Sequence, residues 1–231
     1  MIQKKHLDTN SFTCIISASI KSLKMQRSPN SGPVITLSGA PGGGKTTILE
    51  LLKKRNSTDQ SRFKFFDEIS RGLQKEFCPI TGKPIYDAVE RPDELTKAII
   101  KRRILDIQEA KESKLISVLD RNLTDSLGYY DTFKDPQIDP INDVTRNKLV
   151  KLCLSYPPDL VLFFPFWPEI YVNDEGRCEN PELAQLISNS IYNALRELRI
   201  PFYVVPEGSP EARYDFVMEQ IHSVTHLRTP L

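Results

Sequence analysis

The chain has 231 residues, 39% hydrophobic and 26% charged, which is enough for one self-supporting globular domain. Its 31 lysines and arginines nearly cancel its 30 acids, leaving a net charge of +1. This balance argues against a general nucleic-acid-binding protein, which normally carries a basic excess. The sequence also contains no apolar run near the roughly 18 residues that a membrane-spanning helix needs.

The four cysteines, Cys14, Cys78, Cys153 and Cys178, are far apart in the sequence. They form neither a C-x-x-C pair nor a cluster with histidines, so we do not expect a zinc site. Reduced thiols of this kind are typical of a cytoplasmic protein.

The first 32 residues differ from the rest of the chain. They contain five basic residues and one acid, around a short apolar centre at 12–20. We expect a flexible N-terminal extension. Weak contact with a membrane surface or a protein partner is the alternative, because the segment is basic and partly apolar.

Beyond the extension, short apolar strands alternate with helices, a pattern typical of an α/β domain with a mostly parallel sheet. The first strand, 34–39, leads into a helix at 46–56, and a second strand follows at 62–68. A long helix is then expected at 90–113, before a third strand at 114–121.

The second half continues this alternation. A fourth strand is expected at 159–166, a helix at 180–198, a fifth strand at 200–208 and a closing helix at 209–223. We therefore predict one five-stranded α/β domain over residues 33–231.

The stretch from Gly39 to Thr46 matches the pattern G-x-x-x-x-G-K-[ST] in full. Glycines let successive backbone N–H groups converge on phosphates, and the following helix points its N-terminus at the same charge. Lys45 would reach the β- and γ-phosphates, and the Thr46 hydroxyl would ligate Mg²⁺. The predicted nucleotide-binding residues are Gly39, Ala40, Pro41, Gly42, Gly43, Gly44, Lys45, Thr46 and Thr47.

A phosphate-binding loop with this pattern is called a P-loop. It also needs an acid that holds the metal, usually at the end of an adjacent apolar strand. Asp120 ends the third strand, and Asp67 and Glu68 end the second. We predict Asp120 as the Mg²⁺ ligand, because its strand is the longer apolar run. Of the other pair we favour Glu68 as the group that accepts a proton from a substrate hydroxyl. Helix capping without chemistry is the alternative for all three acids.

One arginine and three aromatic residues near the third strand are further candidates. Arg121 follows Asp120 and would bind groups of an acceptor, or else pair with Asp125 one helical turn away. Tyr129, Tyr130 and Phe133 line either an acceptor pocket or the core.

Two later segments lie where they could contact a nucleotide. The polar segment 167–182 is expected to close as a lid that delivers Arg177, with a solvated loop as the alternative. Arg213 would stack on the nucleobase or stabilise the fold. No N-K-x-D motif follows a late strand, so the choice between ATP and GTP stays open.

Together these segments resemble a small P-loop kinase-like family with an AAA-type label. It includes the nicotinamide-riboside kinase domain of NadR proteins and GTP-binding trafficking-regulator relatives. The matching stretches are GAPGGGKTT, FFDEISR, LDRNLTDSLGYY, LFFPFWPEIYVNDEGR and VVPEGSPEARYDFV. The resemblance implies a P-loop three-layer sandwich with strand order 2-3-1-4-5. It also implies an acceptor site near Glu68 and Arg121, and a lid arginine at Arg177.

The leading functional hypothesis is a Mg²⁺-dependent phosphotransferase that uses ATP or GTP and a small, nucleoside-like acceptor. Its catalytic residues would be Lys45, Glu68, Asp120, Arg121 and Arg177. A nucleotide-dependent switch for a protein or membrane partner is the alternative, modestly favoured by the basic extension. An ATPase that acts on a macromolecule is a third hypothesis, weakened by the near-neutral charge.

Overall fold

A computed structural model of the chain describes residues 31–56, 62–70, 72–73, 92–133, 143–172 and 179–226. Within these residues, five parallel strands form one sheet in the order β2-β3-β1-β4-β5. This confirms the strand order that the family resemblance implies. The strands are β1 (Val34–Ser38), β2 (Phe63–Phe66), β3 (Ile116–Asp120), β4 (Leu160–Phe163) and β5 (Phe202–Val204).

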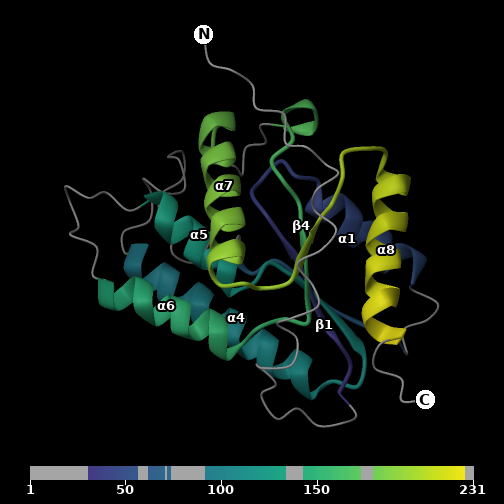
Figure 1. Cartoon of the computed structure of the whole chain (residues 1–231), viewed down its shortest axis with the longest axis horizontal. Coiled ribbons are helices and arrows are strands. Elements are labelled where there is room, and N and C mark those ends of the chain that lie inside the picture. Colours follow the sequence, from purple (N-terminus) through teal and green to yellow (C-terminus); the bar gives the residue numbers. More distant parts are fainter. Residues whose placement is uncertain are drawn as a thin grey trace.

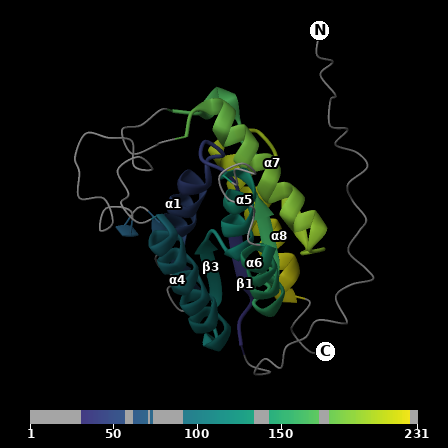
Figure 2. The ribbon, with the colours of Figure 1, turned by 90° about the vertical axis from the view of Figure 1, so that its left-hand side faces the viewer.

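Helices cover both faces of the sheet, which gives the expected three layers. In Figure 1, α4, α5, α6 and α7 lie to one side of β1 and β4, and α1 and α8 lie to the other. Figure 2 shows the same layers after a 90° turn. The helices are α1 (Lys45–Arg55), α4 (Pro92–Glu112), α5 (Leu123–Phe133), α6 (Asp143–Ser155), α7 (Pro181–Glu197) and α8 (Pro210–His226).

The hydrophobic core is divided by the central strand. Alternate residues of a strand point to opposite faces, so Ile35 and Leu37 of β1 pack with α1 and α8, whereas Val34 packs with the α4–α7 layer. All five residues of β1 are buried, as expected for a strand covered on both faces. Their burial fixes the carboxyl end of β1, where the P-loop begins.

Two helices were not predicted from the sequence, α5 and α6. The α5 segment contains Gly128, two tyrosines and two threonines, which are all weaker helix formers than alanine. Its helical state comes from tertiary packing, because Leu123 and Leu127 are buried against the same layer as α4 and α6. The predicted fifth strand is also shorter than expected, at Phe202–Val204.

The start of the described chain is attached to the domain. The N–H of Gly32 donates to the carbonyl oxygen of Ser113 at 2.8 Å. Residues 1–30 lie outside the described part, so the flexible extension at 1–32 stays a prediction.

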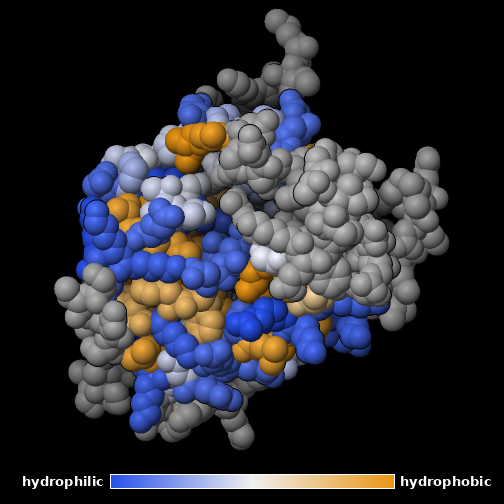
Figure 3. All heavy atoms as spheres, turned by 180° about the vertical axis from the view of Figure 1, so that it is seen from behind, coloured by the Kyte–Doolittle hydropathy of each residue, from blue (hydrophilic) through white to orange (hydrophobic). Residues whose placement is uncertain are grey.

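The described surface is mixed in character. The face seen from behind carries hydrophobic residues in several separate groups among hydrophilic ones (Figure 3). Of the described helices, none combines the length and apolar character that crossing a membrane requires.

Candidate active site

The segment between β1 and α1 forms a loop whose sequence is dictated by backbone geometry. Gly39, Gly42 and Gly44 adopt φ angles of 133°, 81° and 77°, which favour glycine. A Cβ on Gly39 would lie 2.1 Å from the carbonyl oxygen of Phe164, so no side chain fits there. The N-cap residue of α1 is Gly44, which has no side chain that could cap the helix. The first N–H groups of α1 can therefore face an anion.

Lys45 folds back into this loop. Its Nζ donates to the carbonyl oxygens of Gly39 at 2.6 Å and Ala40 at 2.7 Å. Burial, and then the positive charge of Arg121, lower the pKa of Lys45 to about 7, although Asp120 and two other acids oppose the shift. A phosphate group that competes with the two carbonyls would give this ammonium group a charged partner.

The predicted metal ligands lie at the end of β3 and in the first turn of α1. Asp120 ends β3 opposite Leu37 of β1, and Thr46 is exposed in the first turn of α1. The Oδ1 of Asp120 is buried and has no hydrogen-bond partner among the described residues. Burial raises the pKa of this carboxyl, against the opposing charges of Lys45 and Arg121. The buried carboxylate oxygen of Asp120 and the exposed hydroxyl of Thr46 are both of the oxygen-ligand type that Mg²⁺ prefers.

The two acids after β2 lie in different environments. The Asp67 side chain is 72% exposed and pairs with Lys53 of α1. The Glu68 side chain is only 22% exposed, and its Oε1 lies 3.2 Å from Nε of Arg121. Glu68 is therefore the more buried of the two acids and the one that contacts Arg121, and its role as proton acceptor stays a prediction.

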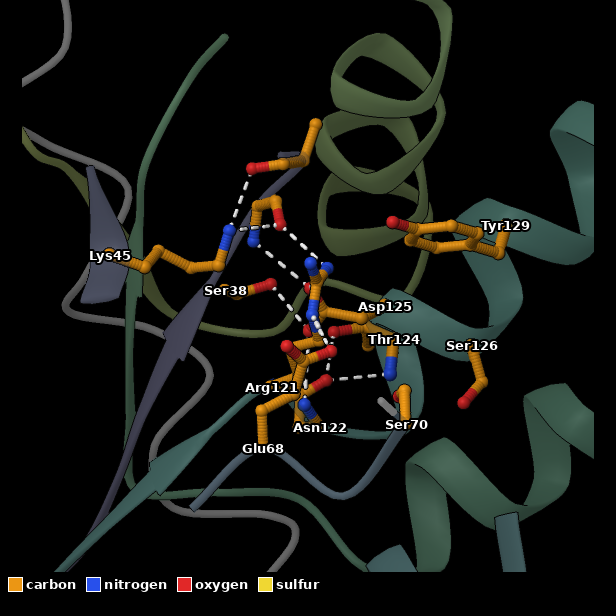
Figure 4. Close-up of polar contacts among 12 residues, drawn as sticks. Ser38, Lys45, Glu68, Ser70, Arg121, Asn122, Thr124, Asp125, Ser126 and Tyr129 are labelled. Carbon is orange, nitrogen blue, oxygen red and sulfur yellow. Dashed lines mark hydrogen bonds and ion pairs between the residues drawn. The ribbon is translucent and has the colours of Figure 1, made fainter. Parts of the chain in front are cut away.

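Arg121 connects the two sides of the site (Figure 4). Besides Glu68, its guanidinium donates to the carbonyl oxygen of Gly39 at 2.9 Å and lies 3.7 Å from Asp125. The backbone of Arg121 has φ 73°, an uncommon value for a residue with a side chain. The structure thus contains the Asp125 pair that we considered as an alternative, together with contacts to both the P-loop and Glu68.

Asp125 has a structural role that the sequence did not reveal. Its carboxylate is fully buried and accepts hydrogen bonds from Ser38 Oγ at 2.8 Å and from the backbone N–H groups of Gly39 and Asn122, both at 3.0 Å. It therefore fixes the start of the P-loop to the turn that carries Arg121. The Asn122 side chain adds a bond to Thr36 of β1 at 2.8 Å.

Arg213 lies against the P-loop from α8. It donates to the carbonyl oxygen of Gly43 at 2.7 Å, and its guanidinium lies over the rings of Phe164 and Trp167. The side chain is buried, and burial lowers the pKa of the guanidinium. In this position it supports the loop. A role in binding the nucleobase stays a prediction.

The remaining site residues predicted from the sequence do not lie together. The Tyr129 hydroxyl donates to Glu179 at 3.1 Å, and its ring lies 5.5 Å from the Arg121 guanidinium. Tyr130 packs against the hydrophobic core, and Phe133 is exposed. Arg177, the predicted lid arginine, lies outside the described residues.

Arg103 of α4 is a buried polar residue near the site that sequence reasoning missed. One of its nitrogens donates to the carbonyl oxygen of Asn122 at 3.1 Å and to the hydroxyl of Ser126. A signal was present in the sequence, because Arg103 precedes the buried Ile107 and Ala110 by four and seven residues. That spacing places all three on one helix face.

The strand order, the glycine loop and the acids beside it define a P-loop NTPase of the kinase-like type. A family model described as an AAA domain matches residues 34–213. The chain belongs to this family. None of the curated proteins matches the sequence at a significant level.

Solved structures of nucleoside and nucleotide kinases share the fold. Deoxyadenosine kinase from M. mycoides, with the products dCMP and dCDP bound, has a TM-score of 0.61 at 16% identity, covering 82% of this chain and 99% of the kinase. Thymidylate kinase from Ehrlichia chaffeensis has a TM-score of 0.55 at 17% identity, with 83% and 99% coverage. NadR in complex with NAD and AMP-PNP has a TM-score of 0.61 at 17% identity, with 87% of this chain matching 51% of NadR.

Proposed function

We propose that this protein is a phosphotransferase that moves the γ-phosphoryl group of a nucleoside triphosphate to a hydroxyl group of a small, nucleoside-like acceptor. The observation that carries the proposal is the position of Arg121, which contacts both Glu68 and the Gly39 carbonyl. A carboxylate is thereby held at a fixed place beside a phosphate-binding loop. The fold neighbours named as kinases of nucleosides and nucleotides support the same reaction type.

In the proposed reaction, an acceptor hydroxyl oxygen forms a bond to the γ-phosphorus while the bond from that phosphorus to the β–γ bridging oxygen breaks. The hydroxyl proton passes to Glu68, and the nucleoside diphosphate leaves. Lys45 leaves the carbonyls of Gly39 and Ala40 to neutralise charge on the phosphates. Arg121 orients Glu68, and Arg177 would complete the site from the lid.

The metal and the nucleotide are part of the same proposal. Thr46 and Asp120 would hold Mg²⁺, which supplies charge neutralisation at the β- and γ-phosphates. The unpartnered Oδ1 of Asp120 supports this assignment. ATP is the favoured donor, because NadR was solved with AMP-PNP, a non-hydrolysable analogue of ATP. Use of GTP is the alternative.

The proposal is tested by transfer of label from the γ-phosphate of ATP or GTP, with Mg²⁺, to a panel of nucleosides, vitamins and sugars. We expect at least one acceptor to be labelled by the wild-type protein. Replacement of Lys45 by alanine should reduce this transfer by about 100-fold or more, because the variant lacks a cation at the developing charge. Release of labelled inorganic phosphate without any labelled acceptor would contradict the proposal and favour a switch or an ATPase.

A further inference from the structure

Arg103 is buried in an unusual environment for a guanidinium group. It lies on α4 and is only 6% exposed. Its contacts are the carbonyl oxygen of Asn122, the hydroxyl of Ser126 and, at 3.4 Å, the hydroxyl of Ser70. These partners are all uncharged. Among the described residues, no carboxylate lies within ion-pair distance of Arg103.

A buried charge without a charged partner is costly for the folded state. Burial lowers the pKa of Arg103, and the largest opposing effect is the charge of Asp125, which lies within ion-pair distance of Arg121. Where a buried charged residue lowers the stability of the free protein, we expect a bound ligand to supply the partner that the residue lacks. Functional sites commonly carry such local costs.

The guanidinium has one edge that is hardly used. NH1 makes the bonds to Asn122 and Ser126, whereas Nε is buried and has no hydrogen-bond partner in the described part of the chain. NH2 makes only the long contact with Ser70. The Nε–NH2 edge of a guanidinium presents two parallel donors, which suit two adjacent acceptor atoms on one planar group.

The Nε–NH2 edge lies on the side of the site where the phosphoryl acceptor would bind, which we call the acceptor side. Ser70 follows Glu68 by two residues, and Asn122 directly follows Arg121. Figure 4 shows Lys45 on one side of Arg121, with Ser70 and Ser126 on the other. A molecule bound between Glu68 and Arg103 would thus lie opposite the phosphate-binding loop.

The charges around the site favour an uncharged acceptor. The charges that act on Arg103 are those of Arg121, Asp125 and Glu68, so two cations and two acids lie together there. Lys45 and Arg213 add positive charge on the side of the P-loop. The described surroundings of Arg103 are therefore neutral, and a phosphate-bearing acceptor would add negative charge that no further described cation balances there.

We propose that Arg103 determines acceptor specificity, by binding through its Nε–NH2 edge a planar, uncharged group with two adjacent hydrogen-bond-accepting atoms. This inference rests on the proposed phosphotransferase function. Among common nucleosides, cytosine offers such a pair at O2 and N3, and guanine offers one at O6 and N7. Adenine and uracil offer no such pair, because a hydrogen-bond donor lies next to each acceptor on the comparable edges. Ser70 gives up its long contact when the acceptor binds.

The test compares the wild-type protein with Arg103→Met, Arg103→Lys and the control Lys101→Met, an exposed position on the same helix. Labelled phosphate transfer is measured for cytidine, guanosine, adenosine and uridine and for their monophosphates. We expect cytidine or guanosine to be the best acceptor. For that acceptor, Arg103→Met should lower kcat/KM by about 100-fold, mainly through KM, and leave nucleotide affinity unchanged. Arg103→Lys should restore little of the lost kcat/KM, because lysine lacks the two parallel donors of a guanidinium group.

Thermal unfolding without ligands provides a second readout that needs no acceptor. Arg103→Met should unfold at the wild-type temperature or above it, because it removes an unopposed buried charge. A clearly lower unfolding temperature than that of Lys101→Met would show that the contacts of Arg103 within the free protein already offset the cost of its burial, and would overturn the inference.

The kinetic outcomes separate the two proposals. If wild-type protein transfers phosphate but Arg103→Met does so equally well, the role of Arg103 is wrong and the phosphotransferase stands. Preference for a monophosphate, for adenosine or for uridine would likewise overturn only the inference about Arg103. If wild-type protein transfers phosphate to no acceptor, the proposed function fails and this inference fails with it.

Discussion

The carbonyl oxygen of Gly39 accepts hydrogen bonds from two cations, Lys45 Nζ and Arg121 NH1. The backbone N–H of the same residue donates to Asp125. Gly39 is therefore the residue at which the phosphate-binding loop meets the acceptor side. The glycine pattern predicted this loop, but not that its first carbonyl joins the two sides, because that contact depends on the fold.

Nucleotide binding should depend on pH through Lys45. Its pKa is lowered to about 7 in the free protein, so the ammonium form that binds phosphate is lost as the pH rises above 7. Between pH 7 and 9, where the γ-phosphate is already ionised, the dissociation constant should rise by up to about tenfold per pH unit. Fluorescent-nucleotide titrations measure this slope. Lys45→Met should bind weakly with no comparable slope, and a flat wild-type profile would contradict the assignment.

The packing of α5 against α7 supports the site at the level of elements. A Cβ on Gly128 of α5 would lie 2.8 Å from the backbone N and Cα of Ile191 in α7, so the two helices approach closely at this glycine. Arg146 of α6 adds paired contacts with Asp131 of α5 and Glu197 of α7, all at 3.1 Å or less. These contacts hold in place the helix that carries Asp125 and Ser126.

Replacement of Gly128 by alanine should therefore destabilise the protein. We expect a loss of about 2 kcal/mol in the free energy of unfolding, because backbone of α7 must move to admit the methyl group. Urea denaturation measures the change. The matched control is Gly72→Ala, where an added Cβ meets no atom within 4 Å and stability should hold or rise slightly. Equal effects at the two positions would rule out close helix packing as the cause.

The sequence predicted the elements with strong local signals. The five strands follow from apolar runs, and the P-loop follows from the fixed spacing of its glycines, Lys45 and Thr46. The helices α5 and α6 could not be predicted so well, because α5 contains weak helix formers and depends on packing in the α4–α7 layer. Arg103 was missed although its spacing to Ile107 and Ala110 places it on an apolar helix face, because only the tertiary fold shows that this face lies beside Asn122.

Across the whole molecule, the parallel sheet brings the functional residues to one edge. Glu68 follows β2, Asp120 ends β3 and the P-loop follows β1, and these three strands are neighbours in the sheet. Carboxyl ends of adjacent parallel strands are where α/β proteins bind ligands. The helices of the two layers then supply the side chains that fix this edge, Asp125 from α5 and Arg213 from α8.

The central claim is that Glu68 serves phosphoryl transfer rather than stability alone. The most direct measurement compares Glu68→Gln with its neighbour Asp67→Asn, using transfer of γ-phosphate to the best acceptor together with nucleotide affinity. We predict that Glu68→Gln lowers transfer by about 100-fold or more while nucleotide affinity is kept, because the amide cannot take the acceptor proton. Asp67→Asn, at an exposed pair with Lys53, should transfer at the wild-type rate. Equal transfer by Glu68→Gln and wild-type protein would contradict the account.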